Sequence, residues 1–309
     1  MLSRRNIRVK VMQTLYSVEA METTKPGEPD KIFHTKIEDT HELLSYLATY
    51  LTQVALYAES YAIRKANKHL PTESDRSVNT KIAGNTILWE ILGNASFKKS
   101  QEKFKTLYLF EKEQIRKSFL KLLDTPEYKE YISIEARDRK SEKGILEFIL
   151  ENLMLSDADF LSDGEEKLIQ WTDDMDAAIV QLKIALDKPS AVDFLEPLSE
   201  DKMAFGLNLL HTVTEKNEYC LELIKPKLRN WDVERIALLD MILMKMGVCE
   251  LLYFETIPTK VTLNEYIDIA KEYSTEKSGH FINGILDNIH KELEAKDKIH
   301  KKNFNKTLK

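Results

Sequence analysis

Apolar residues recur along most of this chain at the three- and four-residue spacing that is typical of an amphipathic helix. Near the start, Ile7, Val11, Leu15 and Val18 form one such stripe. Ser3 precedes the stripe and is placed to cap a helix that runs to about residue 20. The same spacing predicts further helices over residues 41–69, 80–92, 101–123, 143–155, 165–186 and 203–223. The hydrophobic pattern therefore predicts an all-α protein.

Residues 236–252 differ from these segments because they are apolar on nearly every side. Only Asp240, Lys245 and Glu250 interrupt the run that extends from residue 236 to 254. A helix that is hydrophobic all round belongs at the centre of a bundle, and the three charged residues argue against a membrane span. We expect a central core helix here.

Two more helices follow this segment. Thr262 and Glu265 have the T-x-x-E spacing of a capping box, which predicts that a helix begins there and continues to Tyr273. Apolar residues then mark one face of a last helix, namely Phe281, Ile285, Leu286 and Ile289. The last third of the chain is thus predicted to be a compact helical bundle.

Composition narrows the function more than the fold. The chain has 309 residues, of which 43% are hydrophobic and 31% charged, with nine glycines and eight prolines. These values are ordinary for a globular protein, and the few glycines and prolines favour long helices. The net charge of −6 argues against nucleic-acid binding over the whole surface. Any such binding must come from a local basic patch.

Charge is segregated in the middle of the chain. Residues 98–121 hold eight Lys/Arg and three Glu, whereas residues 156–176 hold eight Asp/Glu and one Lys. We favour solvated helix faces that pair with each other, although single-sign patches also attract charged partners. A second RNA contact at residues 98–121 stays open.

The remaining chemistry points to a cytoplasmic protein without a cofactor. Cys220 and Cys249 are isolated, with none of the spacings of zinc sites, so we expect two buried packing cysteines and no disulfide or metal. The N-terminus lacks the apolar segment of a signal peptide. Phosphate loops, the zinc-protease motif and the serine-hydrolase motif are all missing from the sequence, and the seven histidines are scattered. The chain is not expected to be an enzyme.

The first helix carries an unusual concentration of cations for an acidic chain. Arg4, Arg5 and Arg8 lie in its opening turns together with Lys10. On a helical wheel, Arg5 shares one side with Val9, Gln13 and Tyr16. Arginine can fork onto phosphates or stack on bases, and amide and aromatic side chains suit single-stranded RNA. From the residues alone, a solvated charge cluster and a nucleic-acid patch remain equally open.

Two segments together resemble a known family. The first helix reads R-R-N-I-R-V-K-V-M-Q-T-L-Y, and residues 274–284 read S-T-E-K-S-G-H-F-I-N-G after the core helix and the helix that opens N-E-Y-I. Their order is similar to that of the NusB family of bacterial transcription antitermination factors. The resemblance implies a NusB-like helical bundle that binds the boxA element of ribosomal RNA leaders and thereby helps tether nascent RNA to elongating RNA polymerase.

The resemblance also implies site residues. Those that match the RNA-binding positions of the family, or lie beside them, are Arg4, Arg5, Arg8, Gln13, Lys277, Ser278, Phe281 and Asn283. Asn6 stands where the family often has a basic residue, and Lys277 stands where an acidic one is common. Each position also has a structural alternative. Phe281 can pack in the core, and Asn283-Gly284 can let two helices approach closely.

A protein partner is implied as well. NusB-like proteins bind NusE, a small-subunit ribosomal protein, through positions that match Tyr16 and Glu250. Glu250 is a carboxylate late in an apolar helix, and burying it is costly unless it is paired. It therefore marks either a solvated helix end or an ion pair with a basic partner.

The resemblance covers only part of the chain and leaves rival functions. It predicts a NusB-like domain over residues 1–22 plus 195–294, a helical insertion of unknown role over 31–190, and a basic flexible tail over 295–309. One rival is the NusB-like domain of ribosomal RNA methyltransferases, but no glycine-rich cofactor loop accompanies the module. The other is a helical protein-interaction scaffold in which RNA binding is lost or weakened.

Overall fold

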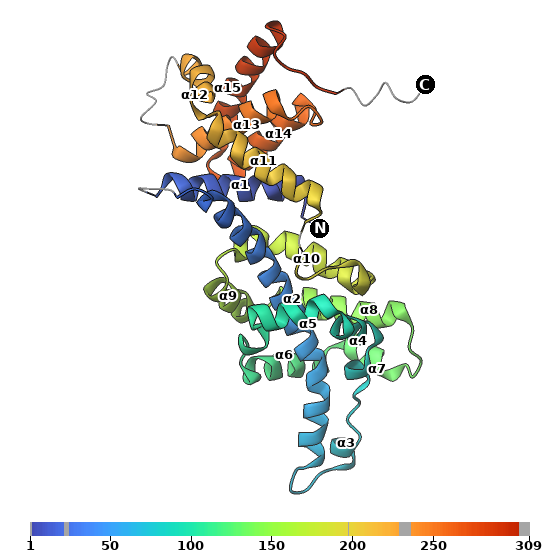
Figure 1. Cartoon of the computed structure of the whole chain (residues 1–309). Coiled ribbons are helices and arrows are strands. Elements are labelled where there is room, and N and C mark those ends of the chain that lie inside the picture. The colour runs from blue at the N-terminus through green and yellow to red at the C-terminus, as the bar shows by residue number, and fades with distance from the viewer. Residues whose placement is uncertain (1, 22–24, 197, 229–235, 303–309) are drawn as a thin grey trace, which may run out of the picture. The chain divides into compact units, whose positions relative to one another are not determined.

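The computed structural model describes residues 2–21, 25–196, 198–228 and 236–302, and within these ranges it contains helices and turns but no strand (Figure 1). The prediction of an all-α protein is therefore confirmed. Residues 22–24 of the first predicted boundary, residues 229–235 before the core helix and residues 303–309 of the basic tail lie outside the described residues.

The chain packs as two compact units. The split unit comprises Leu2–Lys36 together with Leu198–Lys309, and the inner unit comprises Ile37–Pro197. One long helix, α2 (Glu28–Ala66), supplies residues to both units. These units are defined by packing, so the functional domain boundaries suggested by the sequence stay a proposal.

The split unit gathers the first helix and the last five, which Figure 1 shows in blue and in yellow to red. In chain order its helices are α1 (Arg4–Glu19), the start of α2, α11 (Glu200–Glu215), α12 (Asn217–Ile224), the 3₁₀ turn η5 (Lys225–Lys227), α13 (Leu238–Tyr253), α14 (Thr259–Tyr273) and α15 (Glu276–Ala295). Ser3 caps α1 as predicted, and Asn6 completes the capping box. The helix predicted over 203–223 is interrupted at Lys216, between α11 and α12.

Helix α13 is the centre of the split unit, as its sequence predicts. It packs against α1, α11, α12, α14 and α15. Even its three charged residues, Asp240, Lys245 and Glu250, are buried. No helix in the described ranges is long and apolar enough to cross a membrane. The two cysteines are buried, as expected, and lie with 3.4 Å between the sulfur atoms of Cys220 and Cys249.

The predicted capping box of α14 is wrong. The helix begins at Thr259, one turn earlier, and Pro258 precedes it without a side-chain cap. Thr262 instead donates a hydrogen bond to Glu250, and Glu265 lies 3.5 Å from Arg8. Both residues therefore serve contacts between helices, which local spacing cannot distinguish from a cap.

The inner unit contains more and shorter helices than the sequence predicts. Besides most of α2 they are α3 (Glu73–Arg76), η1 (Lys81–Gly84), α4 (Thr86–Gly93), α5 (Ala95–Phe104), η2 (Thr106–Tyr108), α6 (Lys112–Asp124), α7 (Pro126–Ser133), α8 (Arg139–Phe148), η3 (Ile149–Met154), α9 (Ala158–Lys167), α10 (Trp171–Asp187) and η4 (Pro189–Ala191). Lys105 adopts a left-handed conformation with φ of 53° and separates α5 from η2. The single helix predicted over 101–123 is therefore broken.

Segment η3 is a π-helix that continues α8 without a gap. Its i to i−5 hydrogen bonding is visible where the Leu155 amide donates to the Leu150 carbonyl at 3.0 Å. The inward-facing residues of α8 and η3 are Ile145, Leu146, Ile149, Leu150, Leu153 and Met154, and all of them are buried. The six residues form three consecutive pairs, and the wider π turn keeps all three pairs on the side that faces the core.

The core of the inner unit contains many paired polar groups. The hydroxyl pairs Ser45–Ser100, Thr49–Thr106 and Tyr50–Ser118 are buried, with oxygen–oxygen distances of 2.9, 2.8 and 2.7 Å. Buried His41 lies with its Nδ1 3.1 Å from the Phe194 carbonyl. Because a carbonyl only accepts, that nitrogen carries the proton.

Glu142 is one of the charged side chains that are buried in this core. Glu142 accepts hydrogen bonds from the Thr86 amide, the Tyr131 hydroxyl and Arg137, at 2.6, 2.8 and 3.0 Å. The side chain of Arg137 is 37% exposed. The charge of Glu142 is therefore balanced by a helix N-terminus and by an arginine that reaches solvent.

Candidate nucleic-acid interface

A buried ion pair joins the first helix to the central one. Arg8 of α1 donates two parallel hydrogen bonds to Glu250 of α13, from Nε to Oε2 and from Nη2 to Oε1, each at 2.8 Å. The two residues lie 242 positions apart in the sequence, and their side chains are 2% and 0% exposed. This fork-to-fork geometry is the strongest form of arginine–carboxylate pairing.

Helix α14 completes the environment of the pair. The hydroxyl groups of Thr262 and Tyr266 donate to the two oxygens of Glu250 at 2.8 and 3.0 Å. The guanidinium of Arg8 also lies over two aromatic rings, 5.4 Å from the centre of Phe205 and 6.0 Å from that of Tyr266. Glu250 therefore accepts four hydrogen bonds, and α1, α11, α13 and α14 meet at this point.

The pair holds its charge despite burial. Burial by itself would lower the pKa of Arg8, but the hydrogen bonds and charge of Glu250 outweigh it and raise that pKa above its usual value. Burial, reinforced by the negative charge of Glu250, also raises the pKa of Tyr266. The tyrosine therefore stays a neutral donor.

The sequence suggested separate roles for these two residues, and the structure places them together. The solvated helix end considered for Glu250 is excluded, because its side chain is fully buried. Its basic partner belongs to the same chain rather than to another protein. Arg8 likewise does not present its guanidinium to solvent. Sequence analysis missed the contributions of Thr262, Tyr266 and Phe205, whose spacing in the chain gives no signal of this contact.

The two arginines before Arg8 lie nearer to solvent. Arg4 is exposed, and its guanidinium lies 5.6 Å from the centre of the Phe205 ring. Arg5 is half-buried and donates to Glu272 at 2.9 Å, with Asp268 at 3.7 Å. Glu272 is near the end of α14, two residues before Ser274. The Arg5–Glu272 pair thus ties the start of α1 to the turn between α14 and α15.

That turn is built from hydroxyl groups. Thr275 caps α15 by accepting from the Ser278 amide at 3.0 Å, and the Ser278 hydroxyl bonds with those of Thr275 and Ser274. Ser278 is buried, so it shapes the turn rather than its surface. A side chain at Gly279 would lie 2.6 Å from the Cγ atom of Lys271, so glycine is needed for α14 and α15 to approach here.

The other expected residues of this segment lie at different depths. Lys277 and Asn283 are exposed, and Phe281 is half-buried. A side chain at Gly284 would meet no atom within 4 Å. The structural alternative for Asn283-Gly284 is therefore wrong, since Gly279 performs the close approach instead.

The expected strip along α1 is only partly at the surface. Tyr16 is 49% exposed and Gln13 is half-buried, but Val9 and Lys10 are buried along with Arg8. Residues 7–12 are buried on every side because α11 and α13 cover α1. The surface of α1 thus consists of its two ends, with arginines at one end and Tyr16 near the other.

The segment after α15 also contacts this unit. The Lys301 amine donates to the carbonyls of Glu250 and Phe254 at 2.9 and 3.0 Å, and it thereby satisfies the C-terminal end of α13. Burial lowers the pKa of Lys301. Part of the basic segment predicted as a flexible tail is therefore bonded to the central helix in this structure.

The sequence profile of the NusB family matches residues 167–291. The transcription antitermination protein NusB of Salinibacter ruber is 39% identical over 107 residues, which cover 34% of this chain and 67% of that protein. Its counterpart from Finegoldia magna is 37% identical over 97 residues, which cover 31% of this chain and 71% of that protein. This chain belongs to the NusB family.

Two further NusB proteins are also similar to this chain. The transcription antitermination protein NusB of Chloroherpeton thalassium is 47% identical over 72 residues. This match covers 23% of this chain and 34% of that protein. A solved structure of T. maritima NusB is 32% identical, covers 37% of this chain and 78% of its own, and superposes with a TM-score of 0.32. Membership of this family of non-enzymatic factors also confirms that the chain is not an enzyme.

Proposed function

We propose that this NusB-family chain is a cytoplasmic transcription antitermination factor. It binds boxA-type single-stranded RNA of ribosomal RNA leaders together with the NusE ribosomal protein and tethers nascent RNA to elongating RNA polymerase. The names of its relatives, all transcription antitermination proteins, support the antitermination role. The ion pair between Arg5 and Glu272 supports the proposal of RNA binding, because it holds the arginine-bearing start of α1 to the turn before Lys277.

In this proposal the buried and exposed residues have different duties. Arg4, Arg5 and Lys277 attract phosphates, while Phe281, Asn283 and Gln13 contact bases or sugars. Arg8 and Ser278 are positioning residues, because their polar groups are used within the chain. Tyr16 contacts NusE, and Glu250 supports that surface from inside by fixing α1 on α13.

Fluorescence anisotropy with a boxA-like RNA and a scrambled control tests the RNA-binding part. Arg4→Glu and Lys277→Glu should each weaken boxA binding and lower the slope of log affinity against log salt by about 0.7 for each phosphate that the variant no longer binds. Lys291→Glu is the matched control, because Lys291 is an exposed lysine farther along α15. Equal affinities for all three variants and the parent chain would refute the proposed RNA surface.

The NusE contact is tested separately by adding the purified ribosomal protein. An exposed aromatic residue at the centre of an interface typically contributes more than about 2 kcal/mol, so Tyr16→Ala should weaken the complex more than tenfold. Tyr253→Ala removes another exposed tyrosine of the split unit and serves as control. If NusE binds the Tyr16→Ala variant as tightly as the parent chain, the assignment of Tyr16 fails.

One observation favours the alternative scaffold function. Arg8 is buried and Arg5 is paired with acidic residues of α14, so fewer cations face solvent than the sequence suggested. A scaffold would bind NusE with little dependence on salt and would bind no RNA even in the complex, whereas phosphate contacts weaken steeply as salt rises.

A further inference from the structure

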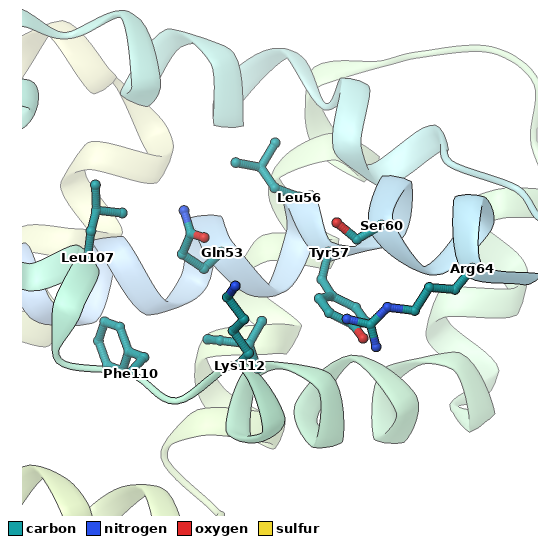
Figure 2. Close-up of a pocket in the computed structure, with 9 residues that line it drawn as sticks. Gln53, Leu56, Tyr57, Ser60, Arg64, Leu107, Phe110 and Lys112 are labelled. Carbon is teal, nitrogen blue, oxygen red and sulfur yellow. The ribbon is translucent and has the colours of Figure 1, made fainter.

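A cavity of about 350 Å³ opens beside α2 in the inner unit (Figure 2). The function proposed above assigns no role to this unit. Its lining comes from α2, from η2 and the loop after it, and from α6, and includes Gln53, Tyr57, Arg64, Leu107, Phe110 and Lys112. The volume lies within the range of roughly 300–1,000 Å³ that is typical of small-molecule sites.

The two ends of the cavity differ in chemistry. Leu107 and Phe110 form an apolar end, and Arg64 lies at the other end of the row of α2 side chains that Figure 2 shows. The Phe110 ring is fixed by Tyr46 and Tyr50, whose ring centres lie 4.5 and 5.0 Å away. A flat apolar group can therefore enter against a wall that is already in place.

The cations of this cavity are not neutralised. The lining contains no carboxylate, and neither Arg64 nor Lys112 forms an ion pair with any residue in the described ranges. Among the other cations of residues 98–121, Lys103 pairs with Glu38, Arg116 with Glu113 and Lys121 with Asp157. Arg64 and Lys112 thus keep their charge available for an anion.

A buried hydroxyl group also lacks a partner here. Tyr57 is 9% exposed, packs on Phe119 and lies beneath the Arg64 guanidinium, whose carbon is 5.4 Å from the ring centre. Its hydroxyl makes no hydrogen bond within the part of the chain that the structure describes. Leaving a buried donor unsatisfied is costly, so a ligand acceptor that displaces the Arg64 guanidinium from above this ring would gain affinity.

We propose that this cavity binds a nucleotide, with the phosphate between Arg64 and Lys112 and the base against Phe110 and Leu107. The Tyr57 hydroxyl would donate to the phosphate or ribose, and the Gln53 amide would bond the polar edge of the base. An aliphatic carboxylate would satisfy the cations but would leave the Gln53 amide against an apolar tail. The nucleotide is either a free one or one residue of single-stranded RNA.

Calorimetric titration of the full chain with AMP, GMP, CMP and UMP tests the proposal. At least one nucleotide should bind, and the matching nucleoside should bind more than about tenfold more weakly, because it lacks the charge-assisted bonds to Arg64 and Lys112. Arg64→Gln and Lys112→Gln should each weaken the nucleotide by about tenfold. Absence of nucleotide binding, or tighter binding of decanoate than of any nucleotide, would overturn the proposal.

Tyr57→Phe separates a ligand contact from a structural role. The substitution removes a hydroxyl that bonds none of the residues that the structure describes, so thermal stability should not fall, yet nucleotide affinity should drop roughly threefold to tenfold. Tyr128→Phe is the matched control, since Tyr128 has a buried hydroxyl without a partner among the described residues and does not line the cavity. Equal nucleotide affinities for these two variants would contradict the site.

A short single-stranded RNA distinguishes the two sources of the nucleotide. If RNA affinity falls in Tyr57→Phe as mononucleotide affinity does, the cavity holds one residue of an RNA chain; if only mononucleotide affinity falls, it holds a free nucleotide. Both results support the site. Because Arg4 and Lys277 belong to the split unit, their variants should leave mononucleotide binding unchanged, so failure of one proposal does not imply failure of the other.

Discussion

Among the residues that the structure describes, each unit buries one glutamate, and the two units balance that charge differently. Glu250 of the split unit faces a buried arginine from a distant helix, with two hydroxyl groups completing its bonds. Glu142 of the inner unit faces a backbone amide, a tyrosine and the partly exposed Arg137. In the split unit the countercharge cannot regain water, whereas in the inner unit it can. Removing one partner should therefore cost much more in the split unit.

The largest expected effect follows from Glu250→Gln. The amide cannot neutralise Arg8, which would keep only the longer contact to the partly exposed Glu265, so we expect the free energy of unfolding to fall by about 3–5 kcal/mol. Urea denaturation measures the loss, and hydrogen exchange of peptides from α1 and α13 locates it. Glu265→Gln is the control, since Glu265 touches the same arginine but is partly exposed. A loss no larger than that of the control would contradict the comparison.

Acid should weaken the inner unit through His41. Burial lowers the pKa of His41 from its usual 6.5 to about 4, so the unfolded chain takes up a proton at a higher pH than the folded chain. Stability is therefore lost as pH falls from 6.5 towards 4, by about 3 kcal/mol in all. Denaturation of the parent and of His41→Gln across this window checks the prediction. Parallel curves for the two proteins would show that another group is responsible.

Glu142→Gln should have a smaller effect than Glu250→Gln. Glutamine retains an acceptor for the Thr86 amide or the Tyr131 hydroxyl, and Arg137 can turn to water. A loss of about 1–2 kcal/mol is expected, which is the range for weakened buried hydrogen bonds. The measurement is urea denaturation, with exchange of peptides from α4 and α8 as the local readout. A loss equal to that of Glu250→Gln would mean that solvent access of the countercharge does not matter.

The smallest effect is expected for Arg137→Gln. A partly exposed arginine gains little from its ion pair because water competes for it, so the loss should be at most about 1 kcal/mol. Arg8→Gln, measured beside it by the same denaturation assay, should lose several times more, because water can take the place of the partly exposed Arg137 but not that of the buried Arg8. Similar losses for the two substitutions would remove the distinction between the units.

Local features of the fold could be predicted from the sequence, whereas contacts between distant segments could not. Ser3 and the Ile7 stripe predicted α1 correctly, and the all-round apolar pattern identified α13 as the central helix. Nothing in local spacing indicated that Arg8 would meet Glu250 or that Thr262 would bond it. Such contacts depend on how helices cross, and a residue that resembles a cap can be recruited by another helix.

The same reasoning applies to the candidate site. The resemblance pointed to segments that reach the surface at Arg4, Lys277 and Asn283. It could not separate Arg4 from Arg8, because one turn of helix decides which of them is covered by α11 and α13. The breaks at Lys105 and Lys216 were missed because lysine is a good helix former and gives no signal that the helix stops.

The π-helical segment η3 has a consequence for how this chain tolerates length changes. Its buried pairs recur every four residues from Ile145 to Met154, a period longer than the 3.6 of an α-helix, so an α-helical path would drift away from the core by about 40° with each repeat. Deleting one residue between 149 and 154 would restore regular α hydrogen bonds. It would also rotate everything after the deletion by about a quarter turn and carry α9 and α10 out of phase with their neighbours. The π turn thus sets the rotational register of the helices that follow it. Shortening it would lower the stability of the fold more than lengthening a surface loop would.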